Sequence, residues 1–530
     1  MRETPVLIVG AGPVGLTLAI DLAQRGVRAT LVERNPHASA LPKMERCNGR
    51  TMEIFRRMGI AGRIRAAGLP RTAPMDVFLA DSLAAPQALV RLPCPSVADA
   101  EAEIAAHNDG RPLEPYQLIS QYTLEPLLRE IAATYPQLTL RFGCEFAGFE
   151  QDEAGVTAEL SDGGATELLR AGYLVGCDGG ASTVRKQLGI GLSGQGSIRT
   201  LRQALFHAPE LYERIALGKG RHYHIAQPPV FPFIILQDST RHWTLHAAAA
   251  SDDEMPAIFR TALGMDVAFE TRSVNAWTQH LLCADRYRDR RAFVAGDAAH
   301  LVIPTGGLGM NTGIGDAADL AWKLAGTLAG WGGPDLLDAY ETERRPIGQR
   351  NVRASGAAMS GRLTWRGAAT RAEMAAAFDR EQRKVTEILG IEAGYRYVDS
   401  PIVAPEAGAG PDPDNPQYVP TTWPGFRLPH VWLDDRTPLA DRLGPGYTLL
   451  RLGTDPPDGA GVVAALRELG APVDELRVPG ERARELYERD LVLVRPDLHV
   501  AWRGNVPPAD PHALARRITG NGAQPVEPRG

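Results

Sequence analysis

A glycine-rich turn near the start of the chain has the residue types and the spacing that bind a pyrophosphate. Residues 10–15 read Gly-Ala-Gly-Pro-Val-Gly, after the apolar run Val6–Val9 and before an amphipathic segment. This order predicts a strand, a tight turn and a helix. Glycines permit the turn and let a pyrophosphate approach the backbone N–H groups at the helix N-terminus.

An acidic residue follows this turn at the distance that a dinucleotide fold requires. Glu33 ends a second apolar run, roughly 20 residues further on, where a carboxylate hydrogen-bonds ribose hydroxyls. A glycine-rich turn without a ligand is the alternative, and the motif alone does not choose between FAD and NAD. The residues predicted to bind the dinucleotide are Gly10, Gly12, Pro13, Gly15, Glu33 and Arg34.

Two later motifs place an aspartate at the end of a predicted strand. Residues 173–185 read Tyr-Leu-Val-Gly-Cys-Asp-Gly-Gly-Ala-Ser-Thr-Val-Arg. Residues 293–313 contain Gly-Asp at 296–297 and then Pro-Thr-Gly-Gly-Leu-Gly-Met-Asn at 304–311. A helix-like pattern follows each motif, so we expect both strands to join the sheet that carries the first turn.

With these motifs the chain resembles the class A flavoprotein monooxygenases, the family of p-hydroxybenzoate hydroxylase and phenol hydroxylase. The resemblance rests on residues 10–15, 178–179 and 296–297, and on the C-terminal run Leu-Val-Leu-Val-Arg-Pro-Asp at 491–497. It implies an α/β fold with a Rossmann-like FAD-binding domain, an inserted antiparallel β-sheet substrate domain and a C-terminal thioredoxin-like domain.

The resemblance also implies an activity. Members bind FAD, take electrons from NAD(P)H as a transient donor, and use O2 to hydroxylate a phenolic or other electron-rich small aromatic substrate through a flavin C4a-hydroperoxide. We expect the same here, with non-covalent FAD, NADPH favoured over NADH, a cytoplasmic location and a homo-oligomer as one option for assembly. The alternatives are a non-catalytic flavoprotein and a flavin-dependent reductase or halogenase. The sequence has no Trp-x-Trp-x-Ile-Pro, the pattern of tryptophan-type halogenases.

The resemblance assigns further residues to FAD. Asp297 would hydrogen-bond the ribityl chain, and the helix that begins near Asn311 would direct its positive end at the negative charge of the reduced flavin. For Asp178, capping of the following helix is the alternative. The additional residues assigned to FAD are Lys43, Arg46, Gln121, Asp178, Gly179, Asp297, Pro304, Gly307, Gly309, Met310 and Asn311.

Two neighbouring charged residues are the predicted catalytic residues. Arg46 matches a basic residue of the family that contacts the flavin, with Lys43 as the second choice. Glu45 falls where phenol hydroxylases carry an acidic residue near the substrate hydroxyl. A carboxylate there would help deprotonate a phenol, whose free pKa is about 10. An ion pair between Glu45 and a neighbouring base is the alternative.

The predicted substrate pocket lies between the inserted sheet and the flavin. Residues 195–290 carry β-branched and aromatic side chains in short alternating runs, which predicts an antiparallel sheet. Alternation places only about half of the side chains of a strand on one face. The residues predicted to contact the substrate are Tyr223, Phe231, Phe233, His246 and Pro304.

Composition shifts along the chain predict its domains. Residues 1–190 and 285–400 form the predicted FAD-binding domain with a helical extension, and residues 191–284 form the substrate domain. Residues 401–424 are rich in Pro and Gly, as linkers are. Residues 425–530 form the thioredoxin-like domain, which has no cysteine, so disulfide exchange is excluded there.

Charge and cysteine usage exclude other classes of function. The net charge is -6 and no basic block is present, which argues against nucleic-acid binding. Apolar runs stop well short of the ~20 residues that a membrane span needs. The five cysteines lack metal-site spacing, so no metal is expected.

Overall fold

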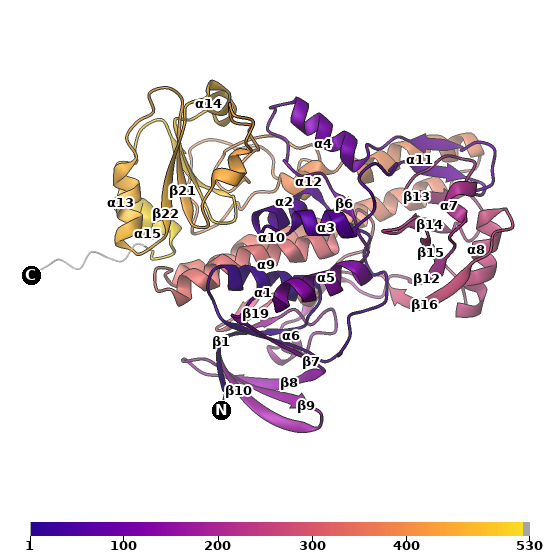
Figure 1. Ribbon diagram of the computed structural model, residues 1–530, viewed down its shortest axis with the longest axis horizontal. Helices are drawn as coiled ribbons and strands as arrows, with labels where there is room; N and C mark the ends of the chain where they lie inside the picture. Colours follow the sequence, from indigo (N-terminus) through magenta and orange to yellow (C-terminus); the bar gives the residue numbers. More distant parts are fainter. Residues whose placement is uncertain (1, 523–530) are drawn as a thin grey trace, which may run out of the picture.

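The three largest sheets lie around two long helices in the computed structural model, which describes residues 2–522 (Figure 1). The helices are α9 (Gly309–Leu328) and α10 (Pro334–Arg366). An eight-stranded sheet and a seven-stranded sheet lie on different sides of them, and a four-stranded sheet follows near the C-terminus. Within the described range, no helix is long and apolar enough to cross a membrane.

The eight-stranded sheet carries the strand that leads into the glycine-rich turn. Its strands β19, β10, β1, β2 and β7 run parallel, and such doubly covered strands are continuous apolar runs. In spatial order the strands are β18 (Arg288–Asp289), β19 (Ala292–Val294), β10 (Ala165–Gly176), β1 (Arg2–Val9), β2 (Ala29–Glu33) and β7 (Leu138–Phe142), with the hairpin β8 (Cys144–Gln151) and β9 (Val156–Asp162) on β10.

Close backbone approaches at the turn after β1 require glycine. Gly10 has a φ of +105°, and a Cβ there would lie 2.4 Å from the Cys177 carbonyl oxygen. A Cβ on Gly15 would lie 2.0 Å from the Gly10 carbonyl oxygen. These contacts let helix α1 (Pro13–Gln24) start directly above the ends of β1 and β10.

The seven-stranded sheet is antiparallel except for the parallel pair of β13 and β4. Its strands β4 and β5 come from the chain before residue 191, so the sheet extends outside the predicted range 191–284. Short strands that pair over long sequence separations leave no local periodicity that assigns them to a sheet. In spatial order the strands are β16 (Glu270–Thr278), β12 (Thr200–His207), β15 (His242–Ala247), β14 (Phe233–Leu236), β13 (His222–Ile225), β4 (Val77–Ala80) and β5 (Val90–Leu92).

A three-stranded sheet joins these two parts. It consists of β11 (Leu192–Gln195), β17 (Leu281–Ala284) and β20 (His300–Leu301). Both ends of the inserted segment therefore leave the first part as paired strands.

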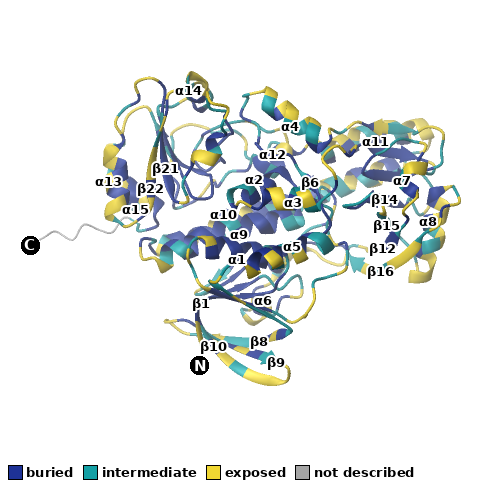
Figure 2. Cartoon of the chain, in the orientation of Figure 1, coloured by how far each residue is buried: buried dark blue, intermediate teal, exposed yellow. Residues whose placement is uncertain are grey.

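Most remaining helices cover these sheets, and Figure 2 shows α1 and α9 largely buried at the centre, with exposed residues on the outer helices. Helix α11 (Arg371–Thr386) folds back beside α10 after a capping box between Thr370 and Glu373. The other helices before residue 400 are α2 (Gly49–Arg57), α3 (Ala61–Ala67), α4 (Val97–Ala106), α5 (Gln121–Ala133), α6 (Thr183–Gln187), α7 (Leu211–Arg214), α8 (Met255–Leu263) and α12 (Leu389–Ala393).

The C-terminal part is a four-stranded sheet with helices, in the arrangement that the thioredoxin-like resemblance implied. Strands β21 and β22 are parallel, and the β21–β23 and β23–β24 pairs are antiparallel. Its elements are β21 (Tyr447–Leu452), α13 (Ala460–Glu468), β22 (Val473–Val478), α14 (Glu481–Tyr487), β23 (Leu491–Val494), β24 (Val500–Gly504) and α15 (Pro511–Ile518).

Residues 401–424, the predicted linker, contain no helix or strand, and the buried residues at the two ends of the segment anchor it. Ile402 is fully buried in the same apolar cluster as Trp322 of α9 and Leu449 of β21. The Ala404 N–H donates to the Ala501 carbonyl oxygen at 2.9 Å. The segment is therefore a fixed connection between the first and third parts.

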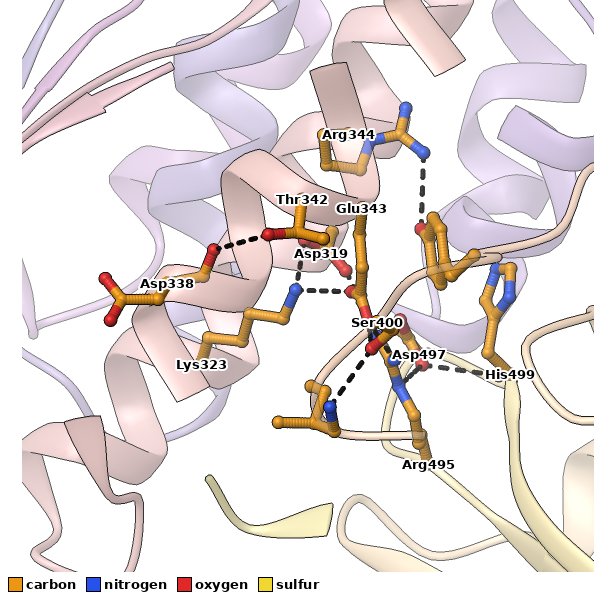
Figure 3. Close-up of polar contacts among 12 residues, drawn as sticks. Asp319, Lys323, Asp338, Thr342, Glu343, Arg344, Ser400, Arg495, Asp497 and His499 are labelled. Atoms are coloured by element: carbon orange, nitrogen blue, oxygen red, sulfur yellow. Dashed lines mark hydrogen bonds and ion pairs between the residues drawn. The ribbon is translucent and has the colours of Figure 1, made fainter. Parts of the chain in front are cut away.

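A buried cluster of charges joins helices α9 and α10 to the C-terminal part (Figure 3). Arg495 donates to Glu343 at 2.5 Å and to Asp497 at 2.6 Å, and Lys323 donates to Asp319 at 2.6 Å. Burial raises the pKa of Asp319 well above its usual value, and Glu343 and Asp497 raise it further. Lys323 and Arg495 act in the opposite direction, since Asp319 accepts from both, so each cation bridges at least two carboxylates of the cluster.

Removal of Arg495 is expected to loosen this junction. Arg495→Met leaves buried carboxylates without a partner, and the loss of one member of a buried pair costs about 3–5 kcal/mol. We expect unfolding at a lower denaturant concentration than in the wild-type protein, measured by tryptophan fluorescence. Arg517→Met, at an exposed position of α15, is the matched control and should change stability by less than about 0.5 kcal/mol. Equal midpoints for the two variants would contradict a structural role of the cluster.

Candidate active site

A cavity of about 840 Å³ lies where the first part meets the seven-stranded sheet. The starts of α1 and α9 line one side, and one face of the seven-stranded sheet lines the other. Helices α10 and α11 contribute the remaining wall. The cavity thus brings residues near 12, 45, 178, 222, 297 and 362 together.

The starts of two helices open on this cavity without a capping side chain. Gly12 is the N-cap of α1 and Leu308 is the N-cap of α9, and neither position has a side-chain cap among the described residues. A Cβ added to Gly12 meets nothing within 4 Å, so the space beside it belongs to the cavity. Unpartnered N–H groups and a positive helix end fit the pyrophosphate of a dinucleotide.

The loop before α9 is held in a shape that only glycines allow. Gly306 and Gly307 have φ values of +90° and +66°, and a Cβ on Gly307 would lie 2.8 Å from Arg46 Nε. Asn311 Nδ2 donates to the Gly307 carbonyl oxygen at 2.6 Å, and Asn311 Oδ1 accepts from the Asn48 N–H at 2.9 Å. The loop therefore presents backbone, with little side-chain bulk, to a flat ring.

Arg46 lies behind this loop on the short strand β3 (Arg46–Cys47), which pairs with β6 (Gln117–Leu118). Its Nη2 donates to the Gly306 carbonyl oxygen at 2.7 Å and to Glu392 Oε1 at 2.9 Å. Arg46 also lines the cavity, so it fixes the loop and faces the predicted flavin position.

Asp297 is exposed while Gly296 and Ala298 beside it are buried. The exposed surface of Asp297 faces the cavity. The surrounding protein still desolvates the carboxyl group and raises its pKa, although His300 and Lys43 act to lower it. Asp316 of α9, which sequence reasoning missed, accepts from the Gly296 N–H at 3.1 Å and so holds the turn.

His300 and Arg344 complete the support of this turn from below. His300 Nε2 donates to Asp316 Oδ2 at 2.7 Å, and Arg344 Nε donates to Asp316 Oδ1 at 2.9 Å. All three side chains are buried, so their role is to position the loop.

Most residues predicted to bind the cofactor line the cavity. Gly10 and Gly15 shape the turn, and Glu33 accepts from the Ala11 N–H at 3.0 Å. Arg34 is exposed outside the cavity. The residues that line the cavity are Gly12, Pro13, Lys43, Arg46, Gln121, Gly179, Asp297, Pro304, Gly307, Gly309, Met310 and Asn311.

Asp178 is placed by its hydrogen bonds to the following helix. Its Oδ2 accepts from the Thr183 N–H at 2.7 Å, and its Oδ1 accepts from the Ser182 hydroxyl at 2.5 Å. Asp178 does not line the cavity. This is the capping role that was the alternative to a cofactor contact.

Glu45 lines the cavity and forms a pair with His222 of β13, whose Nε2 lies 2.8 Å from Glu45 Oε2. Burial acts to raise the pKa of Glu45, but His222, Arg221 and Arg46 lower it to about 2. Burial lowers the pKa of His222 to about 4, against the opposing effect of Glu45. At neutral pH the pair is a carboxylate that accepts from a neutral imidazole, which makes Glu45 a good hydrogen-bond acceptor and a weak base.

The seven-stranded sheet presents alternate side chains to the cavity. Phe231, Phe233, His246 and Pro304 line it as predicted, but Tyr223 does not. The Tyr223 ring stacks on Phe78 with centroids 5.2 Å apart, and its hydroxyl donates to the Gly218 carbonyl oxygen at 3.1 Å. The prediction that Tyr223 lines the cavity was wrong by one residue. Neighbouring side chains of a strand point to opposite faces, and His222 is the one that points into the cavity.

Several cavity residues escaped sequence reasoning because they come from distant elements. The end of α10 and the helix α11 showed only helical periodicity, which gives no sign of what the helix faces. The missed residues with polar side chains include Gln203, Arg221, His222, Asn275, Trp277, Arg362, Arg366 and Gln382.

Comparisons with known proteins agree with this geometry. Residues 3–355 match the family model described as FAD binding domain, and residues 421–522 match the one described as aromatic-ring hydroxylase, C-terminal. The chain therefore belongs to the FAD-dependent aromatic-ring hydroxylases, and the predicted fold class, FAD and flavin-dependent aromatic hydroxylation are confirmed.

Individual relatives extend over nearly the whole chain. The FAD-dependent monooxygenase apdD of Emericella nidulans is 33% identical over 94% of this chain and 87% of its own length. The aklavinone 12-hydroxylase RdmE of Streptomyces purpurascens is 34% identical, over 96% of this chain and 97% of its own. A structure of the rebeccamycin biosynthetic enzyme RebC with reduced flavin has a TM-score of 0.88 at 34% identity, covering 98% of this chain and 100% of that one.

Substitution at Gly12 separates cofactor binding from folding. Gly12 has an extended backbone and open space beside it, so Gly12→Val should fold normally but fill the site of the pyrophosphate. We expect FAD affinity to fall by about tenfold or more, measured by titration of the apoprotein with FAD. Gly62→Val, where a Cβ also meets nothing within 4 Å, is the control and should keep full FAD binding. Unchanged FAD affinity in the Gly12 variant would place the pyrophosphate elsewhere.

Proposed function

We propose that this hydroxylase acts on a phenolic aromatic molecule of several rings, bound between the flavin loop and the aromatic face of the seven-stranded sheet. The observation that carries this proposal is the continuity of the cavity of about 840 Å³ from the starts of α1 and α9 to Phe233 and His246. The cofactor would occupy the end of this cavity at Gly12 and Gly307, which leaves the end at the sheet for the substrate. Ligand sites of this kind are largely apolar and carry a few polar groups that fix the orientation of the ligand. A relative in Streptomyces halstedii, named as a putative polyketide hydroxylase and 33% identical over 96% of this chain, supports a polyketide-like substrate.

Backbone N–H groups and Asp297 bind the cofactor in this proposal. The N–H groups at Gly12 and at the start of α9 bind the pyrophosphate and the flavin, and Asp297 accepts from the ribityl hydroxyls. When bound, FAD supplies the redox chemistry that transfers one atom of O2 to the aromatic ring. NADPH is the proposed electron donor. A cytoplasmic location, which the five widely spaced cysteines favour as reduced thiols, and a homo-oligomer are further parts of the proposal.

Glu45 positions the substrate hydroxyl in this scheme. A carboxylate with a pKa of about 2 accepts a hydrogen bond from a phenol, but it is too weak a base to hold the phenol proton. His222 fixes the carboxylate, and the nearby guanidinium groups of Arg46 and Arg221 favour the phenolate, which is the more reactive form of the ring. Glu45 is thus a substrate-orienting residue, and the charge that favours ionisation comes from the arginines.

The direct test follows NADPH and NADH oxidation by the FAD-loaded protein under air, with and without multi-ring phenols. Product and peroxide are measured together. Oxidation that one phenol accelerates, with product equal to the nicotinamide consumed, supports the proposal. Slow oxidation that no phenol changes, with peroxide as the main product, would contradict it.

The pH dependence tests the role of Glu45. Because the pKa values of Glu45 and His222 are about 2 and 4, neither group titrates at higher pH. kcat/KM should therefore rise with pH as the substrate phenol ionises, and the midpoint of this rise should shift when that phenol is changed. Glu45→Gln should lower kcat/KM by about tenfold to a hundredfold and leave this rise in place. Loss of the rise in the variant would make Glu45 the base.

A further inference from the structure

Two arginines of α10 reach into the cavity from the side opposite the sheet. Arg362 and Arg366 are four residues apart, so they share one face of the helix, and both line the cavity. The Arg362 guanidinium lies over the ring of Phe233, 4.9 Å from its centroid. The Arg366 guanidinium lies 5.6 Å from the centroid of Phe231. Both cations thus face the aromatic part of the cavity.

Neither arginine has an acidic partner in the described part of the chain. No carboxylate oxygen lies within 4.0 Å of either guanidinium, and Arg362 donates no hydrogen bond to a described residue. Arg366 donates only to the Phe231 carbonyl oxygen, at 3.3 Å. The Nε atoms of both are buried without a partner. By contrast, the buried Arg344 and Arg495 are each paired with carboxylates.

A bound anion would stabilise this arrangement of charges. Burial lowers the pKa of each arginine to about 10, so both remain charged at neutral pH. They repel each other along the helix, and Arg199 adds a third positive charge near Arg366. The negative end of α10 and the contacts with Phe231 and Phe233 stabilise the two guanidinium groups. This stabilisation offsets only part of the free energy lost on their desolvation.

The carboxylates nearest this end of the cavity have other partners. Glu45 accepts from the neutral His222 at 2.8 Å and also faces Arg221 and Arg46. It acts on Arg362 only from beyond 4.0 Å. Asp297 lies with the flavin loop. His222 and His246 both have pKa values lowered to about 4 by burial, so they add no charge at neutral pH. Glu45 thus faces three arginines, so positive charge remains in excess in this region and can attract an anionic ligand.

We propose that the substrate is an aromatic carboxylate, and that Arg362, supported by Arg366, binds its carboxylate while Phe231, Phe233 and Trp277 surround its rings. A guanidinium binds a planar carboxylate through parallel N–H donors, and such pairs give orientation as well as affinity. This inference rests on the proposed function, because it assumes that the aromatic substrate occupies this part of the cavity. It names the substrate class that the cavity selects.

The test is binding without turnover. FAD-loaded protein, free of NAD(P)H, is titrated by calorimetry with hydroxyanthraquinone carboxylates and with the methyl ester of each. The wild-type protein should bind at least one acid about tenfold or more tightly than its ester. Arg362→Met should lower the affinity for that acid by about tenfold to a hundredfold and the affinity for the ester by less than about twofold. Arg366→Met should have a smaller effect in the same direction.

Two further variants control for folding and for charge. Arg353→Met removes an exposed arginine from the same helix and should leave acid and ester binding unchanged. Arg362→Lys keeps the charge without the planar donors and should recover part of the affinity for the acid. Thermal melting of each variant shows whether the fold is kept.

Three results would overturn the proposal. No acid of the series binds the wild-type protein more tightly than its ester, or Arg362→Met weakens acid and ester equally. Alternatively, the arginine variants raise the KM for NADPH and leave acid binding intact, in which case the anion belongs to the dinucleotide phosphates. Because binding is measured without NAD(P)H, a bound acid that is never hydroxylated would count against the proposed function only.

Discussion

Val14, in the first turn of α1, packs directly against the backbone of two glycines in the second half of the FAD-binding part. A Cβ on Gly313 of α9 would lie 2.5 Å from Val14 Cγ2, and a Cβ on Gly296 would lie 2.9 Å from the same atom. Any larger side chain would separate the two helices. The contact brings two uncapped helix N-termini to one cavity, and their combined positive ends are what a pyrophosphate and a reduced flavin require.

Helix α9 connects this point to the rest of the molecule. Asn311 donates to the Gly307 carbonyl oxygen of the flavin loop, and Asp316 accepts from the Gly296 N–H. Further along the helix, Asp319 and Lys323 belong to the buried charge cluster around Arg495. One helix therefore links the cavity to the C-terminal part through side chains that are almost entirely buried. A C-terminal part without cysteine has a plain role in this arrangement: it helps to fix α9.

Local motifs were predictable from sequence where backbone geometry demands a residue type. The turn at 10–15 and the loop at 304–311 were visible because a Cβ would collide there or because φ is positive. The position of Tyr223 was not, because a shift of one residue along a strand reverses its face. Arg362 and Arg366 were invisible for a different reason: helical periodicity says which face is shared, and only the fold says what that face meets.

FAD bound in this cavity is expected to transfer one oxygen atom from O2 to an aromatic ring. The most direct measurement supplies isotopically labelled dioxygen to the FAD-loaded protein with NADPH and a substrate that accelerates its oxidation, and then weighs the product by mass spectrometry. A product that carries one labelled oxygen atom on the ring is the predicted result. A product whose new oxygen comes from water, or an unchanged substrate with only labelled peroxide formed, would contradict the claim.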